Sequence, residues 1–566
     1  MYSLPNDPEV IGENRFEPPP GWLWPILGLA VVLSFPYYFS LETFFSHDDF
    51  AILWFHKDWP IWQPWRFLDV HVLTFYRPLQ SYTLAVLFHF FGMTPFPYCL
   101  VLVSIHLTNV VLFGRLIDRL FNDRSLAFLS VIFFAANWEY CDVVYWKGNY
   151  GTALSWLFVL ASGNAFLDHL RTRRTFSRAL SYVLAVAALL SKETAANVPI
   201  VFTLMYGMYL WRPKEARDAL QPFGEHATPP EESDLEPLRR PKRALLQLGP
   251  FYALAGAYAV FYRYGVKDVY VWLPKGYELA PPAEMVHAVA HAATFWLVWW
   301  FYAGVEILTT GPAQLSLLRW LHRGVADLPA FPYYVLPLLL VVASVALRNR
   351  RLLCGLLWAV VAFLPANLIA EYHTPRYYYG SLMGIALVYA EIFLSADRAI
   401  ARRATFEMVA FARVIGALLI LAFVATSMFL TTSYVGGEAR RCRQIENVYR
   451  YLVSQRGRFP SKTLYEVGCL NQTDHFHYGM GVREMFKLAL HDDEVEAVLP
   501  GQPLTTRTLA ILHEEYPRRV RLERLHTGRF RLREIGGPAT ETPSPSSSTQ
   551  YEDPSATPPV ISPREP

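Results

Sequence analysis

The sequence is poor in charged residues, because Asp, Glu, Lys and Arg make up only 17% of its 566 residues while 53% are hydrophobic. Soluble domains usually carry about 25% charged residues. The mean hydropathy is +0.20 although the chain ends in a polar tail and contains a long charged loop. This composition argues against a soluble enzyme and predicts a polytopic membrane protein. The net charge of +3 is too small to indicate a nucleic-acid partner.

Cysteine is also scarce, and five residues are too few for a disulfide-built scaffold. Cys442 and Cys469 can form one bridge if the C-terminal part lies outside the cytosol. No cleavable signal peptide is evident, because the first apolar run follows roughly twenty polar and Pro-rich residues and is long enough to span a bilayer. We interpret this run as a signal anchor. The sequence contains no internal repeat.

The long apolar runs predict an all-α membrane domain, since a crossing helix needs about 20 mostly apolar residues. Basic loops stay in the cytosol, which places 168–178, 347–351 and 396–403 on the inside. Working outward from these loops predicts about 11 transmembrane helices. They lie near residues 22–40, 97–119, 125–137, 150–167, 179–190, 196–211, 244–262, 331–347, 352–370, 378–395 and 410–431.

Two apolar stretches, 79–92 and 287–308, are interpreted as helices in the outer interface, and a true span stays open for the second. The expected organisation is a cytosolic segment 1–21, a membrane domain 22–431 with a first outer loop 41–95, an extracytosolic domain 432–535 and a disordered tail 536–566. The domain 432–535 is predicted as small α/β, because a polar-faced helix precedes one strand and a hairpin around His526-Thr527-Gly528.

Acidic and basic residues gather at the predicted outer membrane boundary. Each one can be an ordinary interfacial ion pair or an exposed loop charge, but ionisable groups at membrane depth are costly. Their convergence with many aromatic residues predicts a pocket for an anionic, lipid-linked and polyhydroxylated substrate. The residues are Asp48, Asp49, Arg77, Glu139, Asp142, Lys147, Lys192, Glu193, Glu371, His373 and Arg376.

Transfer of a sugar from a polyprenyl phosphate would suit such a pocket. A cation at the interface would bind the leaving phosphate, and Arg77, which precedes Pro78 and an apolar helix, is placed for that role. The acceptor hydroxyl needs a carboxylate base. Two adjacent carboxylates cannot both ionise in one small site without raising a pKa, so we expect one of Asp48 and Asp49 to act as base and the other to orient it or to bind sugar hydroxyls.

A divalent metal is the rival explanation for the residues around this acidic pair. Nitrogen and oxygen ligands can hold Mn²⁺ or Zn²⁺, and the candidates are His47, Asp48, Asp49, His56 and His71. No compact ligand motif such as HExxH or paired CxxC occurs. We therefore assign no metal ligand and no certain cofactor, and interpret His47 as structural.

Four motifs resemble the GT-C superfamily of integral-membrane glycosyltransferases, especially the branch with protein O-mannosyltransferases and the aminoarabinose transferase of lipid A. The motifs are "HDDF" at 47–50, "YRPLQSY" at 76–82, "SKETA" at 191–195 and "EYHTPRYYYGSLMG" at 371–384. The resemblance implies that Asp48 is the base, Asp49 the second acid and Arg77 a contact of the lipid phosphate. It maps the later motifs to Lys192, Glu193, Glu371, Arg376 and Tyr377. No tetratricopeptide repeats follow the membrane part, unlike one branch of the family.

The resemblance predicts a glycosyltransferase that moves a sugar from a polyprenyl-phosphate donor to a lipid, glycan or protein acceptor at the outer face. Lys192 and Arg376 would join Arg77 at the donor phosphate, and the substrate would contact Glu139, Lys147, Glu193, Glu371, His373 and Tyr377. The expected location is a bacterial inner membrane with the site facing the periplasm, with the endoplasmic reticulum as the alternative. A transporter or flippase of lipid-linked sugars and a scaffold are the rival functions.

Overall fold

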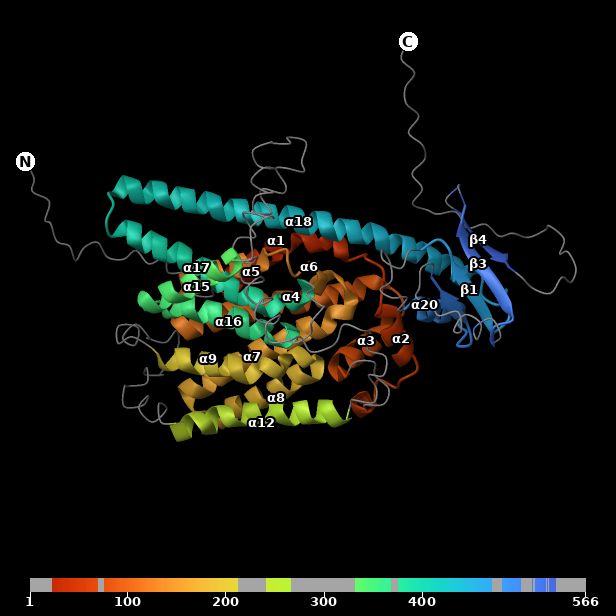
Figure 1. Ribbon diagram of the computed structural model, residues 1–566, viewed down its shortest axis with the longest axis horizontal. Coiled ribbons are helices and arrows are strands. Elements are labelled where there is room, and N and C mark those ends of the chain that lie inside the picture. Colours follow the sequence, from red (N-terminus) through yellow and green to blue (C-terminus); the bar gives the residue numbers. More distant parts are fainter. Residues whose placement is uncertain are drawn as a thin grey trace, which may run out of the picture.

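The computed structural model describes residues 23–69, 76–211, 241–265, 331–367, 375–470 and 481–499, together with residue 512 and most of 515–535. The predicted helix 287–308 and the tails lie outside these residues. A bundle of long helices forms most of the chain (Figure 1). Its members are α1 (Leu23–Leu33), α4 (Pro95–Phe121), α5 (Arg124–Ala135), α7 (Tyr150–Thr172), α8 (Thr175–Ser191), α9 (Val198–Leu210), α12 (Pro241–Gly265), α15 (Phe331–Ala346), α16 (Arg350–Asn367), α17 (Tyr379–Ala401) and α18 (Phe406–Ser454).

Every predicted span overlaps one of these helices, so the prediction of a helical bundle is confirmed. Five helical stretches are long and apolar enough to cross a membrane, and three shorter apolar helices accompany them among the described residues. The exact number of crossings therefore stays a prediction. The first predicted span, 22–40, is an α-helix only as far as Leu33, and it continues as a 3₁₀ turn, η1 (Phe35–Ser40), where Pro36 occurs.

The basic loops meet at one end of the bundle. Glu391 of α17 accepts Arg398 at 2.6 Å and Arg351, the second residue of α16, at 3.5 Å. At the ends of α4 and α7, Arg119 pairs with Asp168 at 2.9 Å. The connections predicted to be cytosolic thus share one end, as the sequence-based topology requires. The turn between α17 and α18 lies at this end, opposite α2, α3 and the sheet (Figure 1).

Short helices occupy the other end of the bundle. The first outer loop forms α2 (Asp49–His56), η2 (Pro64–Leu68) and α3 (Pro78–Phe91), and the last of these matches the predicted interfacial helix 79–92. Later connections contribute α6 (Cys141–Tyr145), η3 (Lys147–Asn149), η4 (Glu193–Asn197) and η6 (Pro375–Tyr377). Almost all predicted site residues lie on these elements or directly beside them.

One helix joins the membrane domain to the C-terminal domain. The sequence predicts a span at 410–431 followed by a separate polar-faced helix, whereas α18 runs without interruption through 49 residues. No proline occurs in this stretch, and the paired Gly436 and Gly437 do not break the helix. In Figure 1, α18 passes along the bundle and carries the sheet at its far end.

The C-terminal domain contains a four-stranded sheet in the order β2-β1-β3-β4. Its strands are β1 (Thr463–Val467), β2 (Glu496–Val498), β3 (Arg518–Arg524) and β4 (Phe530–Glu534). β1 is parallel to β2 and β3, and β3 pairs antiparallel with β4 as the predicted hairpin. The helix α20 (Val482–Leu490) connects β1 to β2 and packs on the sheet through Phe486, whose ring lies 5.0 Å from that of Tyr465.

The disulfide that the sequence allowed is not formed, because Cys442 and Cys469 are both free thiols. Cys442 lies on α18 beside Ser46 of the first loop, whereas Cys469 follows β1 and faces Arg524. The two sulfur atoms therefore belong to different packing environments.

Candidate active site

The acidic pair lies where the first outer loop enters α2. Asp49 is the first residue of this helix, only 2% of its surface is exposed, and its Oδ2 accepts the backbone N–H of Ser46 at 3.0 Å. Asp48 immediately precedes the helix and is half-buried. A carboxylate that binds free N–H groups at a helix start is stabilising. Asp49 therefore fixes the loop. Asp48, which is less buried, lies at the edge of this loop.

Lys147 binds the backbone of the same loop. Its ammonium donates to the carbonyl oxygens of Thr43 and Phe44, the second at 3.2 Å, and lies 5.3 Å from the ring centroid of Phe45. Only 1% of Lys147 is exposed. We expected this lysine to contact substrate, but the structure turns its charge toward the loop backbone and toward Asp49. Its observed contacts are those of a residue that shapes the loop.

Gly148 brings the two carboxylates close to a single point. A Cβ at this glycine would lie 2.9 Å from Asp48 Oδ1 and 3.2 Å from Asp49 Oδ1. The Gly148 carbonyl accepts Gln80 Nε2 of α3 at 2.7 Å, which fixes the glycine against the first loop. Burial raises the pKa of Asp49 to about 7, nearby Lys147 lowers it in part, and Asp48 raises it further. Near neutral pH the pair therefore carries less than two full charges.

An unpaired donor faces this carboxylate pair. Trp146 Nε1 is buried and has no hydrogen-bond partner within the described part of the chain, and the same holds for Asp48 Oδ1. Both atoms lie within 3.1 Å of the position that a Gly148 Cβ would take. Buried polar atoms are normally paired. Asp48 Oδ1 and Trp146 Nε1 thus offer one acceptor and one donor to a polar ligand.

Arg77 is held by Glu193. Arg77 Nε donates to Glu193 Oε2 at 2.9 Å and Nη2 to Oε1 at 2.5 Å, which joins the start of α3 to η4. This ion pair raises the pKa of Arg77, although burial opposes it, and it lowers the pKa of Glu193 to about 2 against the effect of burial. Both groups are thus charged at neutral pH. The sequence did not predict their pairing.

Two further cations lie near this ion pair. Lys192 Nζ donates to Thr152 Oγ1 at 2.6 Å and lies 5.0 Å from the ring centroid of Tyr377. Arg376 stacks on Trp146 at 5.0 Å and on Tyr377 at 5.4 Å. Cationic groups on aromatic faces are favourable. These rings therefore orient two of the three predicted phosphate-binding cations.

The cations and the acidic pair form one electrostatic cluster. Burial lowers the pKa of Lys192 well below its usual range, the positive charges of Arg77 and Arg376 lower it further, and Glu193 and Asp48 oppose them. Residues from the first loop, η4 and η6 thus act on the same ammonium group. The convergence that the sequence predicted is observed for Asp48, Arg77, Lys192, Glu193 and Arg376.

Glu139 is buried, with only 3% of it exposed. Asp142 is close to Arg376, which partly offsets the burial that raises its pKa. Neither carboxylate approaches the Gly148 position as closely as Asp48 and Asp49 do. Glu371 and His373 lie outside the described residues.

Within the described ranges, no three His, Cys, Asp or Glu side chains come together in a way that could hold a metal ion. His56, one of the candidate ligands, donates Nδ1–H to the Ile52 carbonyl oxygen at 2.7 Å and stacks on Phe67. Burial lowers the pKa of His56 to about 4. His71 lies outside the described residues.

Four residues at the site, Trp146, Gly148, Gln80 and Thr152, were not predicted from the sequence. The first two occur in the stretch "YWKGNYG" at 145–151, of which only Lys147 was predicted, because it is charged. A glycine between Lys147 and Asn149 gives no local signal of its closeness to a carboxylate far away in sequence. Gln80 lies within "YRPLQSY", from which only Arg77 was predicted as a site residue.

Comparison with known proteins gave matches to solved structures alone. No family model matches the chain, and no curated protein matches it. The archaeal oligosaccharyltransferase AglB from Archaeoglobus fulgidus, in complex with an inhibitory peptide and a dolichol-phosphate, is 13% identical with a TM-score of 0.43, over 88% of this chain and 69% of AglB. ArnT from Cupriavidus metallidurans bound to undecaprenyl phosphate is also 13% identical with a TM-score of 0.43, over 88% of each chain.

Both matched proteins are GT-C membrane glycosyltransferases, the class that the sequence motifs resemble. At these identities and TM-scores the likeness is distant. It assigns neither an activity nor any site residue to this chain.

Proposed function

We propose that this protein is a membrane glycosyltransferase that moves a sugar from a polyprenyl-phosphate donor to a lipid, glycan or protein acceptor. The observation that carries the proposal is the position of two buried atoms without a partner, Asp48 Oδ1 and Trp146 Nε1, beside a cluster of three basic residues. A base for the acceptor hydroxyl and cations for a phosphate are the two requirements of this reaction.

In the proposed reaction, Asp48 takes the proton of the acceptor hydroxyl as its oxygen attacks the anomeric carbon of the donor sugar. The bond between that carbon and the phosphate oxygen breaks, and the phosphate leaves with the electron pair. Arg77, Lys192 and Arg376 stabilise the phosphate charge, and Glu193 orients Arg77. Asp49 holds the loop so that Asp48 is available. Asp48 afterwards releases the proton to solvent.

We further propose that the site faces the periplasm of a bacterial inner membrane, with the lumen of the endoplasmic reticulum as the alternative. The grouping of the basic loops at the opposite end of the bundle supports this orientation. The lipid tail of the donor would then stay in the bilayer while its phosphate lies at the interface.

The test compares membranes that contain the full-length wild type or one variant at matched expression. Transfer of a radiolabelled sugar from the lipid-linked pool of the membranes is measured, and binding of undecaprenyl phosphate to the purified chain is followed by native mass spectrometry. Asp48→Asn should lower transfer by about 100-fold or more, because it removes a general base. It should leave undecaprenyl phosphate binding intact.

Asp49→Asn should cause a smaller loss of transfer, and Arg77→Ala should weaken undecaprenyl phosphate binding about tenfold or more. Glu42→Gln, an exposed carboxylate of the same loop, is the matched control and should behave as wild type. Full transfer by both Asp variants would refute the assignment of the base. Lipid-linked sugar that crosses the membrane without transfer would favour the transporter.

A further inference from the structure

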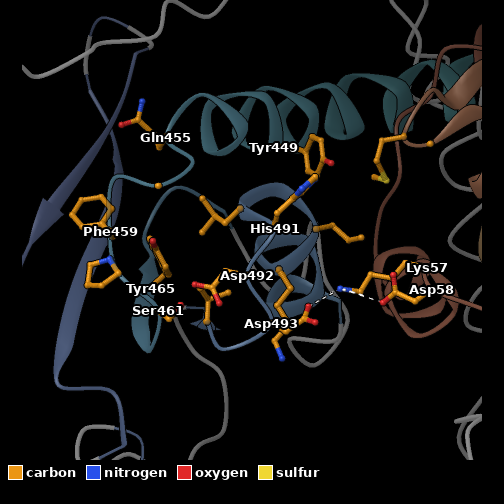
Figure 2. Close-up of a pocket in the computed structure, with 18 of the residues that line it drawn as sticks. Lys57, Asp58, Tyr449, Gln455, Phe459, Ser461, Tyr465, His491, Asp492 and Asp493 are labelled. Atoms are coloured by element: carbon orange, nitrogen blue, oxygen red, sulfur yellow. Dashed lines mark hydrogen bonds and ion pairs between the residues drawn. The ribbon is translucent and has the colours of Figure 1, made fainter.

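A cavity lies at the junction between the first outer loop and the C-terminal domain. Its volume is about 990 Å³, at the upper end of the range for pockets that hold small molecules. The walls come from the end of α2, the end of α3, the end of α18, and the segments that flank β1 and follow α20. Figure 2 shows Tyr449 entering from α18 and Lys57 and Asp58 facing it from the first loop.

The lining combines aromatic rings with carboxylate, hydroxyl and amide groups. Phe459 and Tyr465 lie on the sheet side, with ring centroids 6.3 Å apart, and Ser461 lies between them in sequence. Asp492 adds a carboxylate from the segment after α20 (Figure 2). Aromatic faces pack on the C–H surface of a sugar ring, and carboxylates and hydroxyls bind its hydroxyl groups.

The positive charges in the cavity are already engaged. Lys57 Nζ pairs with Asp493 at 2.7 Å and lies 3.7 Å from Asp58, whose side chain is 82% exposed. Lys487 Nζ lies 4.5 Å from the ring centroid of Trp54. Burial and the nearby Arg483 lower the pKa of Lys487. An anionic ligand would have to compete with these contacts, whereas a neutral ligand would not.

The cavity is connected to the acidic pair through rigid elements. α2 begins at Asp49 and ends beside Lys57, so about 12 Å of helix separates the two regions. Tyr449, which lines the cavity, also packs on Phe44 and Phe50 of the first loop, with ring centroids 5.5 and 6.5 Å apart. Tyr449 thus contacts both the cavity and the loop that carries the proposed base.

We infer that this cavity binds a neutral, polyhydroxylated carbohydrate, the acceptor glycan of the transfer reaction. The acceptor role rests on the proposed function, whereas the binding of carbohydrate does not. A sugar ring would stack on the partly exposed Phe459, and Asp492 and Ser461 would bind hydroxyl groups. The reactive end of the acceptor would extend along α2 toward Asp48.

The inference is tested with the full-length protein in lipid nanodiscs and saturation-transfer NMR. The probes are maltotriose, a neutral trisaccharide, and trigalacturonate, an anionic one. Ser461→Trp places an indole in the cavity, and Phe459→Ala removes one aromatic wall. Glu494→Trp is the matched control, because Glu494 is exposed, adjoins two lining residues and does not line the cavity. Undecaprenyl phosphate binding is measured in parallel for all variants.

Maltotriose should bind the wild type and Glu494→Trp equally and bind Ser461→Trp and Phe459→Ala at least tenfold more weakly, with undecaprenyl phosphate binding unchanged in all four. Equal maltotriose binding by Ser461→Trp, no binding by wild type, or stronger binding of trigalacturonate would each overturn the inference. The proposed function fails separately, if Asp48→Asn keeps full transfer. In that case loss of maltotriose binding in Ser461→Trp would still establish the carbohydrate site.

Discussion

Asp48 Oδ1 and Asp49 Oδ1 are both buried without a donor in the described part of the protein, but Asp49 is the more deeply buried residue and its Oδ2 accepts the N–H of Ser46. This difference gives the two acids separate roles. A residue that must accept a proton from substrate needs a lone pair directed at the ligand, and a residue that holds a loop does not. The deeper burial of Asp49 and its bond to the loop backbone therefore favour Asp48 as base.

The raised pKa of Asp49 predicts a pH dependence of stability. The folded protein holds the proton up to about pH 7, while the unfolded chain releases it near the usual value of 3.8. The stabilisation is fully present below pH 3.8 and is lost as the pH rises through 7. The thermal midpoint of the wild type should thus fall between pH 5 and 8 relative to that of Asp49→Asn, as measured by differential scanning fluorimetry in detergent. Parallel curves for the two proteins would contradict this, and Glu42→Gln should follow the wild type.

The pairing of Arg77 with Glu193 predicts that stability and lipid binding can be separated. Arg77→Met or Glu193→Met alone leaves a partly buried charge without its partner, and each should destabilise the protein by about 3 kcal/mol. The double variant should recover most of this stability, because neither charge remains. It should still bind undecaprenyl phosphate poorly.

The measurement combines a double-mutant cycle of unfolding free energies with native mass spectrometry of the lipid complex. Recovery of both properties in the double variant would show that Arg77 serves structure alone. Additive stability losses would show that the two side chains are not coupled.

Apolar helices could be predicted from sequence because their signal is local. The predicted span 97–119 corresponds to Pro95–Phe121, and the predicted interfacial helix 79–92 to Pro78–Phe91. The hairpin of β3 and β4 was also predicted from strand alternation and a short turn. The continuity of α18 was not, because a change from apolar to polar composition resembles a domain boundary although the backbone continues as a helix.

The contacts of the candidate site were only partly predictable, because they join residues far apart in sequence. Arg77 and Glu193 are 116 positions apart, and both were selected, but as separate ligands of the substrate. Lys147 was selected for its charge, yet its ammonium binds backbone carbonyls. Which residues gather at one membrane face follows from topology. Which of them pair with one another depends on three-dimensional packing.

The start of α20 bears directly on the acidic pair. Gly481 has a φ of +84°, and a Cβ there would lie 1.9 Å from the carbonyl oxygen of His47, so the C-terminal domain closely contacts the residue before Asp48. Gly457 has a similar φ of +72°, but a Cβ there would meet nothing within 4 Å. A comparison of variants at the two glycines therefore distinguishes the effect of backbone strain from the effect of contact with the first loop.

Gly481→Ala should therefore lose most sugar transfer, whereas Gly457→Ala should retain it. Both variants should lose about 1 kcal/mol of stability from the left-handed backbone. Transfer by membranes and thermal midpoints are measured for both proteins. Equal activity of the two variants would mean that the C-terminal domain does not position Asp48.

At the scale of the whole molecule, charge is divided between the two ends of the bundle. The end with the α17–α18 turn contains ion pairs of basic loops, and the other end contains the acidic pair and the C-terminal domain (Figure 1). Basic loops stay in the cytosol during insertion. The distribution predicts that the candidate site faces away from the cytosol.

Cysteine labelling of intact cells tests this orientation. A membrane-impermeant maleimide should modify Glu42→Cys in intact spheroplasts and modify Arg402→Cys only after permeabilisation, since both positions are exposed at opposite ends of the bundle. Four of the five native cysteines are buried, and the wild type measures the background. The reverse labelling pattern would invert the topology and place Asp48 in the cytosol.

Because α18 is uninterrupted, it fixes the distance between the C-terminal domain and the membrane. Its 49 residues extend about 74 Å, of which a bilayer core occupies roughly 30 Å. A straight helix resists bending. One part of α18 lies in lipid, and the other part carries α20 and the sheet, so α18 sets the distance between them. In a thicker bilayer, α18 would move toward the membrane relative to the bundle. The contact between Gly481 and His47 would then change with the thickness of the membrane in which the protein resides.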